Sequence, residues 1–336
     1  MILVTGGTGL VGAHLLYRLA SKKQQIRAIY RSDKKFKTVK HIFSYYSNDV
    51  NSLFNTIDWV KADLNDIPAL TDAFKDITHV YHCAALVSFE PNKFDLLQKT
   101  NINGTATIVN LCISNNIEKL CYVSSIAALG QPLNNSPITE SSEWNNELEH
   151  DVYAITKYGA ELEVWRGTQE GVNAIIVNPG VIIGPGIWKY GSGSLIKTVH
   201  NGLKYYTKGS TGFVSIDHVI NGMINLMDSS IVNERFILIS NTWSYKRFLT
   251  TCAKALQVKP PTKEAKNRLL QIGWRLDWLS HKLTGKRRKL TKQLVKSLNS
   301  KTIYDNSKLK SHIDIKFKSL DDTIKEVSKL YIKDIN

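Results

Sequence analysis

Residues 2–12, Ile-Leu-Val-Thr-Gly-Gly-Thr-Gly-Leu-Val-Gly, decide the fold of this chain. The apolar run 2–4 predicts a buried strand, and the amphipathic pattern of 10–22 predicts a helix directly after it. Gly6 permits a tight turn between them, Gly9 lets the backbone approach a pyrophosphate, and Gly12 lets the helix pack closely on the strand. The helix N-terminus would then face the phosphates. The sequence therefore predicts a dinucleotide-binding turn made of Thr5, Gly6, Gly7, Thr8, Gly9, Leu10, Val11 and Gly12.

The same alternation of a short apolar run and a longer amphipathic segment continues to about residue 178. Further strands are expected at Ile26–Tyr30, Trp59–Val60, Val80–Cys83, Leu120–Ser124 and Ala174–Val177. Helices are expected at Leu70–Phe74, Asp95–Asn115 and Tyr153–Glu170. Parallel strand pairs need a crossover, which is usually a helix. We therefore expect an α/β fold with a Rossmann-type, doubly wound parallel sheet and a smaller, mostly C-terminal substrate lobe.

The alternation breaks after residue 178, where stretches rich in Gly, Pro and Ser begin. Gly212–Ile216 and Phe236–Ile239 still resemble strands that could rejoin or extend the sheet. The expected division is an NAD(P)-binding domain at 1–177, rejoined by 214–240, and a substrate lobe made of 178–213 and 241–336.

Composition narrows the class of protein. The four cysteines, Cys83, Cys112, Cys121 and Cys252, have no paired spacing, which favours a reduced cytoplasmic protein without a metal site. The net charge of +15 fits nucleic acid, an anionic membrane or phosphorylated ligands equally well. Its densest run, 286–289, lies far from any glycine-rich or aromatic nucleic-acid motif, so we expect no nucleic-acid partner and interpret the run as solvated surface.

The residue after the second expected strand predicts the choice of cofactor. A carboxylate there would accept a hydrogen bond from the 2′-hydroxyl of NAD, but the position is Arg31. An arginine can instead pair with a 2′-phosphate, and Ser32, Lys34 and Lys35 add donors and positive charge. The sequence thus favours NADPH over NADH, with ordinary solvated loop charges as the alternative.

Two later strand ends carry residues that suit a dinucleotide. Asp63 and Leu64 follow the third strand, where they could meet the adenine amino group, and Ala84 and Ala85 follow the fourth, where small side chains let a flat cofactor lie close. A helix-capping aspartate and small residues chosen for packing explain the same pattern.

Tyr153 and Lys157 carry the expected chemistry. Their i, i+4 spacing puts phenol and ammonium on one helix face, and the nearby cation should lower the pKa of the phenol toward working pH. The phenol could then both give and take a proton. Ser124 and Ser125 close the fifth strand, where a hydroxyl could hold a carbonyl for hydride attack.

Taken together, the glycine turn, the strand-end serine and the tyrosine–lysine helix resemble the extended short-chain dehydrogenase/reductase superfamily, the NAD-dependent epimerase/dehydratase family. The resemblance runs from Met1 to the region 304–309. It implies that Ser125, five residues before Gly130, is the catalytic serine, and that Tyr153 and Lys157 are the acid/base pair. It further implies cofactor contacts at Asp63, Leu64, Ala84, Ala85, Asn101, Pro179, Gly180 and Val181, with Asn101 supporting the site and the segment after Asn178 passing the nicotinamide amide.

Departures from the family pattern narrow the substrate. Dehydratases carry Thr-Asp-Glu where this chain has Ser-Ile-Ala at 125–127, and Val181 stands where sugar-nucleotide enzymes usually have asparagine. An arginine expected just before 214–218 is also absent. The resemblance therefore points to a hydrophobic substrate, as in the dihydroflavonol-reductase-like and 3β-hydroxysteroid-dehydrogenase-like branches. The candidate contacts are Val87, Ser88, Ser125, Ile187 and Trp188, although the aromatic residues could simply pack the lobe.

The segment 262–289 has an amphipathic pattern. Its apolar residues recur at spacings of three and four, and Gly285 is placed to end the helix. We expect the stripe to pack on the lobe; the alternative is peripheral membrane contact, with tryptophans at the headgroup level and the basic run meeting anionic lipid. Arg268, Arg275, Asp277 and Lys282 interrupt any run long enough to span a bilayer.

The sequence as a whole predicts an NADPH-dependent oxidoreductase acting on a CH–OH group. It would interconvert a ketone or aldehyde and an alcohol on a hydrophobic small molecule by hydride transfer. The alternatives are a nucleotide-sugar epimerase and a non-catalytic protein that senses dinucleotide. A homodimer is a further expectation from the resemblance.

Overall fold

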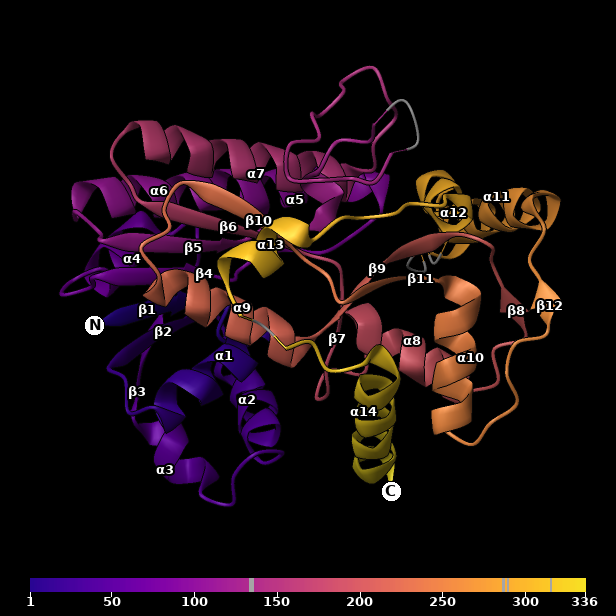
Figure 1. Cartoon of the computed structure of the whole chain (residues 1–336), viewed down its shortest axis with the longest axis horizontal. Helices are drawn as coiled ribbons and strands as arrows, with labels where there is room; N and C mark the ends of the chain where they lie inside the picture. The colour runs from indigo at the N-terminus through magenta and orange to yellow at the C-terminus, as the bar shows by residue number, and fades with distance from the viewer. Residues whose placement is uncertain (133–135, 286–287, 289, 315) are drawn as a thin grey trace.

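Seven parallel strands form the central sheet of the computed structural model, in the order β10-β6-β5-β4-β1-β2-β3 (Figure 1). The structure describes residues 1–132, 136–285, 288, 290–314 and 316–336. The strands are β1 (Ile2–Thr5), β2 (Ile26–Tyr30), β3 (Ile57–Lys61), β4 (His79–His82), β5 (Lys119–Val123), β6 (Ala174–Pro179) and β10 (Glu234–Leu238). Each of the first six overlaps a strand expected from the sequence.

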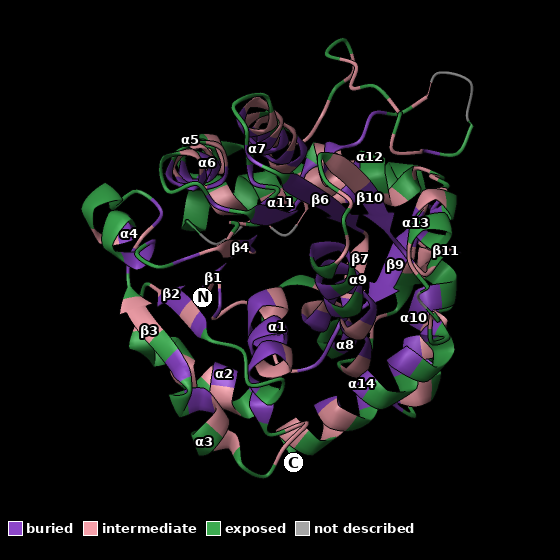
Figure 2. Cartoon of the chain, turned by 60° about the vertical axis from the view of Figure 1, so that its left-hand side comes forward, coloured by how far each residue is buried: buried purple, intermediate pink, exposed green. Residues whose placement is uncertain are grey.

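Helices cover both faces of this sheet because successive strand residues point to opposite sides. Val4 packs with α1 (Leu10–Ser21), α2 (Phe36–Phe43), α3 (Val50–Asn55) and α9 (Ile216–Asp228). Its neighbour Leu3 packs with α4 (Ile67–Ala73), α6 (Gly104–Ser114) and α7 (Val152–Gln169). Figure 1 shows α6 and α7 above the sheet and α1, α2 and α9 below it, and Figure 2 shows the buried strands between helices whose outer sides are exposed. The predicted Rossmann-type fold is confirmed.

Two small sheets and three helices build the other half of the molecule. β7 (Val181–Ile183), β9 (Ser210–Ser215) and β11 (Asn241–Ser244) form one sheet, and β8 (Tyr205–Tyr206) and β12 (Lys263–Glu264) the other. Apolar residues of β7, β8, β9 and β11 form a separate core with α8 (Gly191–His200), α10 (Tyr245–Ala255) and α14 (Leu320–Ile335). Of the two later strands expected from the sequence, β10 joins the central sheet beside β6, whereas β9 pairs with β7 in the small sheet.

The helix expected at Asp95–Asn115 has an irregular middle. It consists of α5 (Phe94–Leu97), the π-helical segment η3 (Gln98–Asn103) and α6. The remaining short elements are η1 (Asp33–Lys35), η2 (Pro91–Lys93), η4 (Ile126–Ala128), α12 (Lys292–Asn299) and α13 (Ser307–His312).

The late amphipathic segment forms α11 (Asn267–Thr284), which ends at Gly285 in the left-handed conformation, as predicted. The expected packing is confirmed only in part: the helix packs on α12 through Leu270 and Trp274, but not through the five aliphatic residues of its stripe. Leu270 on the other side of the helix is buried, and the stripe residues are exposed: Leu269, Ile272, Leu276, Leu279 and Leu283. The basic run 286–289 lies outside the described residues except for Arg288. No helix in the described part of the chain combines the length and apolar composition that crossing a membrane requires.

Candidate active site

The turn between β1 and α1 has room only for glycine at two positions. Gly6 has φ +68°, and a Cβ on it would lie 2.6 Å from the backbone nitrogen of Ala84. A Cβ on Gly12 would lie 2.3 Å from the carbonyl oxygen of Gly6. Gly9 is the N-cap of α1 and provides no side chain to occupy the N–H groups of the first turn, while Leu10 and Val11 pack their side chains against the core. This cradle of backbone N–H groups at a helix N-terminus fits a dinucleotide pyrophosphate.

A buried chain of hydrogen bonds joins this turn to the end of β4. Thr5 Oγ1 lies 2.6 Å from His82 Nδ1 and accepts from the N–H of Ala84 at 3.2 Å. His82 Nε2 lies 3.0 Å from Thr105 Oγ1 on α6. Burial lowers the pKa of His82 to about 3, so the imidazole is neutral at physiological pH. These contacts fix the segment of Ala84 and the exposed Ala85 beside the glycine turn.

Just after β2 and β3, the structure brings Arg31 and Asp63 together. Their side chains are 65% and 43% exposed, and Arg31 NH1 lies 3.7 Å from Asp63 Oδ2. Burial raises the pKa of Asp63, but hydrogen bonds from Asn65 and the charge of Arg31 outweigh it and hold that pKa below its usual value. Leu64 is buried in the core, whereas Lys35 is exposed in η1. A 2′-phosphate at this place would compete with Asp63 for Arg31.

Ser125 and Tyr153 meet at the carboxyl end of β5. Ser125 precedes η4 and its Oγ accepts from the N–H of Ala127 at 3.1 Å. Asp151 caps α7 by accepting from the N–H of Ala154 at 2.8 Å, which places Tyr153 in the first turn of that helix. Burial raises the pKa of Tyr153 to about 12, and the hydrogen bond with the Ser125 side chain acts against that rise.

Lys157 lies one turn further along α7 and is 1% exposed. Its Nζ donates to the hydroxyl of Tyr122 at 2.7 Å and to the carbonyl oxygen of Val123 at 2.8 Å. Burial lowers the pKa of Lys157 to about 7, against the opposing charge of Glu161. The predicted fall in the pKa of Tyr153 is therefore wrong: burial of the phenol dominates, and the ammonium is directed to Tyr122.

Asn101 is buried, and all its side-chain hydrogen bonds among the described residues go to the loop after β4 and to α7. It is 1% exposed and lies in the π-helical segment η3, a conformation that is common at functional sites. Its side chain accepts from the N–H of Leu86 at 2.8 Å and donates to the carbonyl of Leu86 at 3.0 Å and to Thr156 Oγ1 at 3.1 Å. Asn101 thereby holds the loop after β4 against α7.

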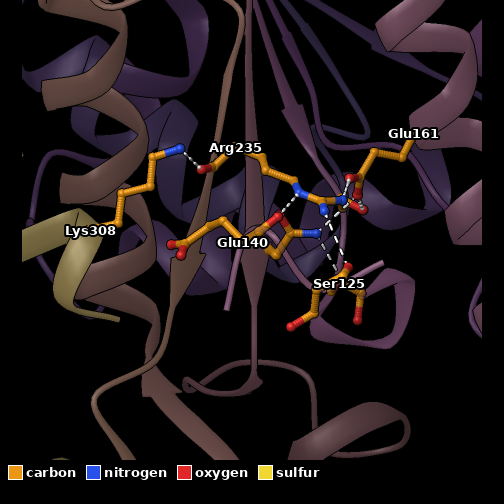
Figure 3. A network of polar contacts seen from close by, with 8 residues as sticks. Ser125, Glu140, Glu161, Arg235 and Lys308 are labelled. Carbon is orange, nitrogen blue, oxygen red and sulfur yellow. Dashed lines mark hydrogen bonds and ion pairs between the residues drawn. The ribbon is translucent and has the colours of Figure 1, made fainter. Parts of the chain in front are cut away.

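A buried ion pair that the sequence analysis missed lies behind Ser125 (Figure 3). Arg235 of β10 donates from NH1 to Glu161 Oε1 at 2.9 Å, and the Glu161 carboxylate is 1% exposed. Glu161 Oε2 also accepts from Ser124 Oγ at 2.7 Å and from Asn178 Nδ2 at 3.0 Å. Asn178 Nδ2 donates in turn to the carbonyl oxygen of Ser125 at 3.0 Å. The ion pair therefore holds the backbone at Ser125 in place.

Asn178 also shows how the segment expected to pass the nicotinamide amide is held. Among the described residues its Oδ1 is buried without a hydrogen-bond partner, which leaves an acceptor open beside Pro179. Pro179 is buried at the end of β6, and the N–H of Gly180 donates to Leu238 at 3.1 Å. A Cβ on Gly180 would lie 2.4 Å from the carbonyl oxygen of Gly212, so this position needs glycine. The side chain of Val181 packs against the core of the small half.

The expected substrate contacts differ in their placement. Val87 is 52% exposed, but Ser88 is buried and its Oγ bonds to Glu90 at 3.4 Å. Ile187 packs against the main core, and Trp188 donates to Asp334 of α14 at 2.7 Å. Of these four residues, Val87 is therefore the exposed one, whereas Trp188 is held by its hydrogen bond within the small half.

A cavity of about 690 Å³ lies apart from the serine, tyrosine and lysine. It is lined by residues that include Glu140, Trp144, Glu161, Arg235 and Lys308. Both members of the ion pair, Glu161 and Arg235, line this cavity, whereas Ser125, Tyr153 and Lys157 do not.

Comparison with known proteins agrees with this geometry. A putative dihydroflavonol 4-reductase of Synechocystis sp. is 32% identical over 182 residues, which cover 54% of this chain and 49% of that protein. Sterol demethylase protein B of Methylococcus capsulatus is 26% identical over 243 residues, 70% of this chain and 68% of that protein.

A solved UDP-glucose 4-epimerase of Thermotoga maritima, described with UDP-glucose, superposes with a TM-score of 0.77 at 18% identity. The superposition covers 100% of this chain and 99% of that one, and it shows the shared fold. The family model described as NAD dependent epimerase/dehydratase family matches residues 2–230. The chain therefore belongs to the NAD dependent epimerase/dehydratase family and is an oxidoreductase of the extended short-chain dehydrogenase/reductase type.

Proposed function

We propose that the protein is an NADPH-dependent reductase that interconverts a ketone or aldehyde and an alcohol on a hydrophobic small molecule. The observation that carries this proposal is the meeting of Ser125 and Tyr153, with the Lys157 ammonium buried behind them at the carboxyl end of β5. Carboxyl ends of parallel strands are where doubly wound sheets bind their ligands.

The two hydroxyls suit reduction of a carbonyl. The glycine turn at Gly6, Gly9 and Gly12 would hold the dinucleotide, whose nicotinamide would supply the hydride for the carbonyl carbon. Ser125 and Tyr153 donate hydrogen bonds to the carbonyl oxygen, and Tyr153 then transfers its proton to that oxygen. With a pKa raised to about 12, the phenol holds this proton at neutral pH. Lys157 supports the phenolate that is left, and the reverse oxidation uses the same groups.

Two features support a hydrophobic substrate. Phe89 and Tyr153 contact edge to face with ring centroids 5.6 Å apart. Phe89 is exposed, and so is Val87, two residues before it in the same loop. Relatives named for a dihydroflavonol and a sterol would act on substrates of this kind.

The preference for NADPH rests on Arg31. Its guanidinium is exposed at the end of β2, beside the position expected for the adenosine ribose, and its contact with Asp63 is long. Arginine can form two parallel hydrogen bonds with a phosphate. The 3.7 Å contact of Arg31 with Asp63 is long and exposed, so it is weak, and a 2′-phosphate could replace it.

The remaining expectations from the sequence accompany the proposal. They are an NAD(P)-binding domain at 1–177 rejoined by 214–240, a substrate lobe made of 178–213 and 241–336, a homodimer and a cytoplasmic location.

The second candidate is an epimerase that oxidises and re-reduces its substrate without net consumption of cofactor. The family description favours it as a candidate. Dinucleotide that stays bound through purification would support the epimerase, whereas a preparation that must be loaded with NADPH supports the reductase. A dinucleotide sensor, the third candidate, has no use for Ser125, Tyr153 and Lys157.

The test combines binding and turnover. Purified protein is titrated with NADPH and NADH by fluorescence, and a panel of hydrophobic ketones and aldehydes is then followed at the NADPH absorbance band. We expect turnover that Tyr153→Phe abolishes and that Tyr190→Phe, at a tyrosine 63% exposed, leaves unchanged. Full activity of Tyr153→Phe on an identified substrate would refute the mechanism.

A further inference from the structure

The geometry points to a docking surface for an anionic lipid bilayer on helix α11, and we propose that the protein binds membranes through it. The surface consists of five apolar residues, which we call the α11 stripe: Leu269, Ile272, Leu276, Leu279 and Leu283. Their exposed fractions are 46%, 56%, 61%, 45% and 75%, in the same order. Soluble proteins rarely expose so continuous an apolar row without a partner for it.

The opposite face of α11 is the one that holds the helix to the protein. Leu270 is 9% exposed and packs with Val295 of α12, and Trp274 joins the same cluster. Asp277, the only acidic residue of α11, has an oxygen 3.2 Å from the N–H of Leu290. At about 100° of rotation per residue, the stripe occupies an arc of about 80° on the far side of the helix from these residues. The stripe is therefore not needed for folding of the helix onto α12.

Cations border the stripe along one edge. Arg268, Arg275 and Lys282 follow each other at intervals of seven residues, so they form a row beside the stripe, and all three are exposed. Trp278 lies beyond this row, 46% exposed, with Lys282 Nζ 5.4 Å from its ring centroid. The other edge carries Gly273 and Ser280, which have no charge. An apolar stripe with flanking cations and tryptophan is the pattern of a helix that lies in a bilayer interface.

The charge pattern argues against a second copy of the chain as the occupant. Spacings of three and four also suit pairing of two helices, which places the residues bordering the stripe face to face. In an antiparallel pair the row of Arg268, Arg275 and Lys282 would face itself, and neither edge offers a carboxylate to pair with it. Phospholipid headgroups provide the missing negative charge, and the net charge of +15 acts in the same direction.

The position of α11 leaves the stripe accessible. Figure 1 shows α11 and α12 at the end of the molecule away from β1, β2 and β3. No helix in the described ranges crosses a membrane, so the contact would be peripheral, with the helix lying in the plane of the interface.

Co-sedimentation of the whole protein with vesicles tests the proposal. One set of vesicles contains phosphatidylcholine alone, and the other also contains about 30% phosphatidylserine. We expect at least about tenfold more bound protein on the anionic vesicles, falling as salt is raised from about 0.05 to about 0.5 M. The double variant Leu276→Glu with Leu283→Glu should lose at least about tenfold in binding. Arg275→Gln with Lys282→Gln should lose binding to the anionic vesicles by several-fold.

The matched control is Ile67→Glu with Val232→Glu, at residues 58% and 39% exposed on α4 and in the loop before β10. It adds the same charge and should bind vesicles as the unchanged protein does. Equal thermal melting of all variants shows that they are folded. The proposal is overturned if the protein does not bind anionic vesicles, if the control loses as much binding as the stripe variant, or if the stripe variant only converts a dimer to a monomer. Because vesicle binding needs no substrate, its failure leaves the reductase proposal intact, and the reverse also holds.

Discussion

The ammonium of Lys157 donates a 2.7 Å hydrogen bond to the hydroxyl of Tyr122, a residue of β5 that lies fully inside the protein. The Nζ also lies 4.4 Å from the centroid of the Tyr122 ring. The ring of Tyr122 stacks on His82, with centroids 5.5 Å apart, and His82 contacts Thr5 at the glycine turn. Lys157 and the glycine turn are thus joined through two buried residues, Tyr122 and His82.

Tyr122→Phe should lower kcat by about tenfold, which corresponds to the loss of roughly one hydrogen bond to a charged group. The ring remains, so the core stays filled, but the Lys157 ammonium loses one of its two acceptors. Its pKa, already lowered to about 7, should fall further. The descending limb of the pH profile of kcat/KM should therefore move to lower pH.

Tyr81→Phe is the control for this prediction. Tyr81 is equally buried on the adjacent strand β4, but it packs against the opposite helical layer. Its variant should leave the pH profile in place. A Tyr122→Phe enzyme with the unchanged profile would show that the tyrosine only fills space.

Stability should depend on pH through Lys157. Burial lowers its pKa from about 10.5 in the unfolded chain to about 7 in the folded protein. Between these values the unfolded chain binds more protons, so this lysine makes the free energy of unfolding rise with pH. From pH 7 to 9 the gain should be about 1–3 kcal/mol relative to Lys157→Met, which cannot titrate. Urea unfolding of both proteins at several pH values measures it, and parallel curves would contradict it.

The fold was predictable because its signals are local. The turn at Gly6 and the apolar runs at β1 and β2 each follow from a few adjacent residues. The Ser125–Tyr153 meeting was predictable for a related reason: parallel strands and following helices bring their ends to one edge. The place of β9 in the small sheet was not predictable in this way, since it depends on pairing with β7 between residues 32 positions apart.

The parts that sequence reasoning missed depend on distant contacts. Glu161 stands four residues after Lys157, so the helical pattern could have placed both on one face of the helix. Its partner Arg235 lies 74 positions away, and no local pattern indicates that pairing. The direction of the Lys157 ammonium toward Tyr122 was equally hidden, because it depends on how α7 packs over β5. Exposure of the α11 stripe could not be predicted either, since periodicity shows an apolar face but not what covers it.

Arg31→Ala should weaken NADPH binding by about tenfold while leaving NADH binding nearly unchanged, because only NADPH carries the 2′-phosphate. Fluorescence titration with both dinucleotides gives the two dissociation constants. Lys75→Ala removes an exposed cation that lies two residues after α4 and pairs with Asp72 of that helix, and it should change neither constant. If Arg31→Ala weakened the binding of NADPH and NADH equally, the arginine would act through its positive charge on both dinucleotides and not through the 2′-phosphate.

Substitutions of Glu161 and Arg235, which form the buried ion pair, should have strongly non-additive effects on the free energy of unfolding. Glu161→Gln or Arg235→Met alone leaves a mostly buried charge without its partner, and each should cost about 3 kcal/mol in the free energy of unfolding. The double variant should cost less than the sum by about 1.5–3 kcal/mol, because it removes both charges. Chemical denaturation of the four proteins gives this coupling. Activity should fall most in Glu161→Gln, since the carboxylate that anchors both Ser124 and Asn178 beside Ser125 is replaced. In Arg235→Met the carboxylate remains but loses the cation that holds it.

A second ion pair on the same helix provides the matched comparison. Glu163 and Arg166 of α7 have the same 2.9 Å separation, but their side chains are 29% and 38% exposed. Solvent screens such pairs, so the cycle of Glu163→Gln and Arg166→Met should show coupling below about 1 kcal/mol and unchanged activity. If the cycle at Glu161 and Arg235 gave the same small coupling, burial would not strengthen that pair, and the ion pair would not be the element that holds Ser125 in place.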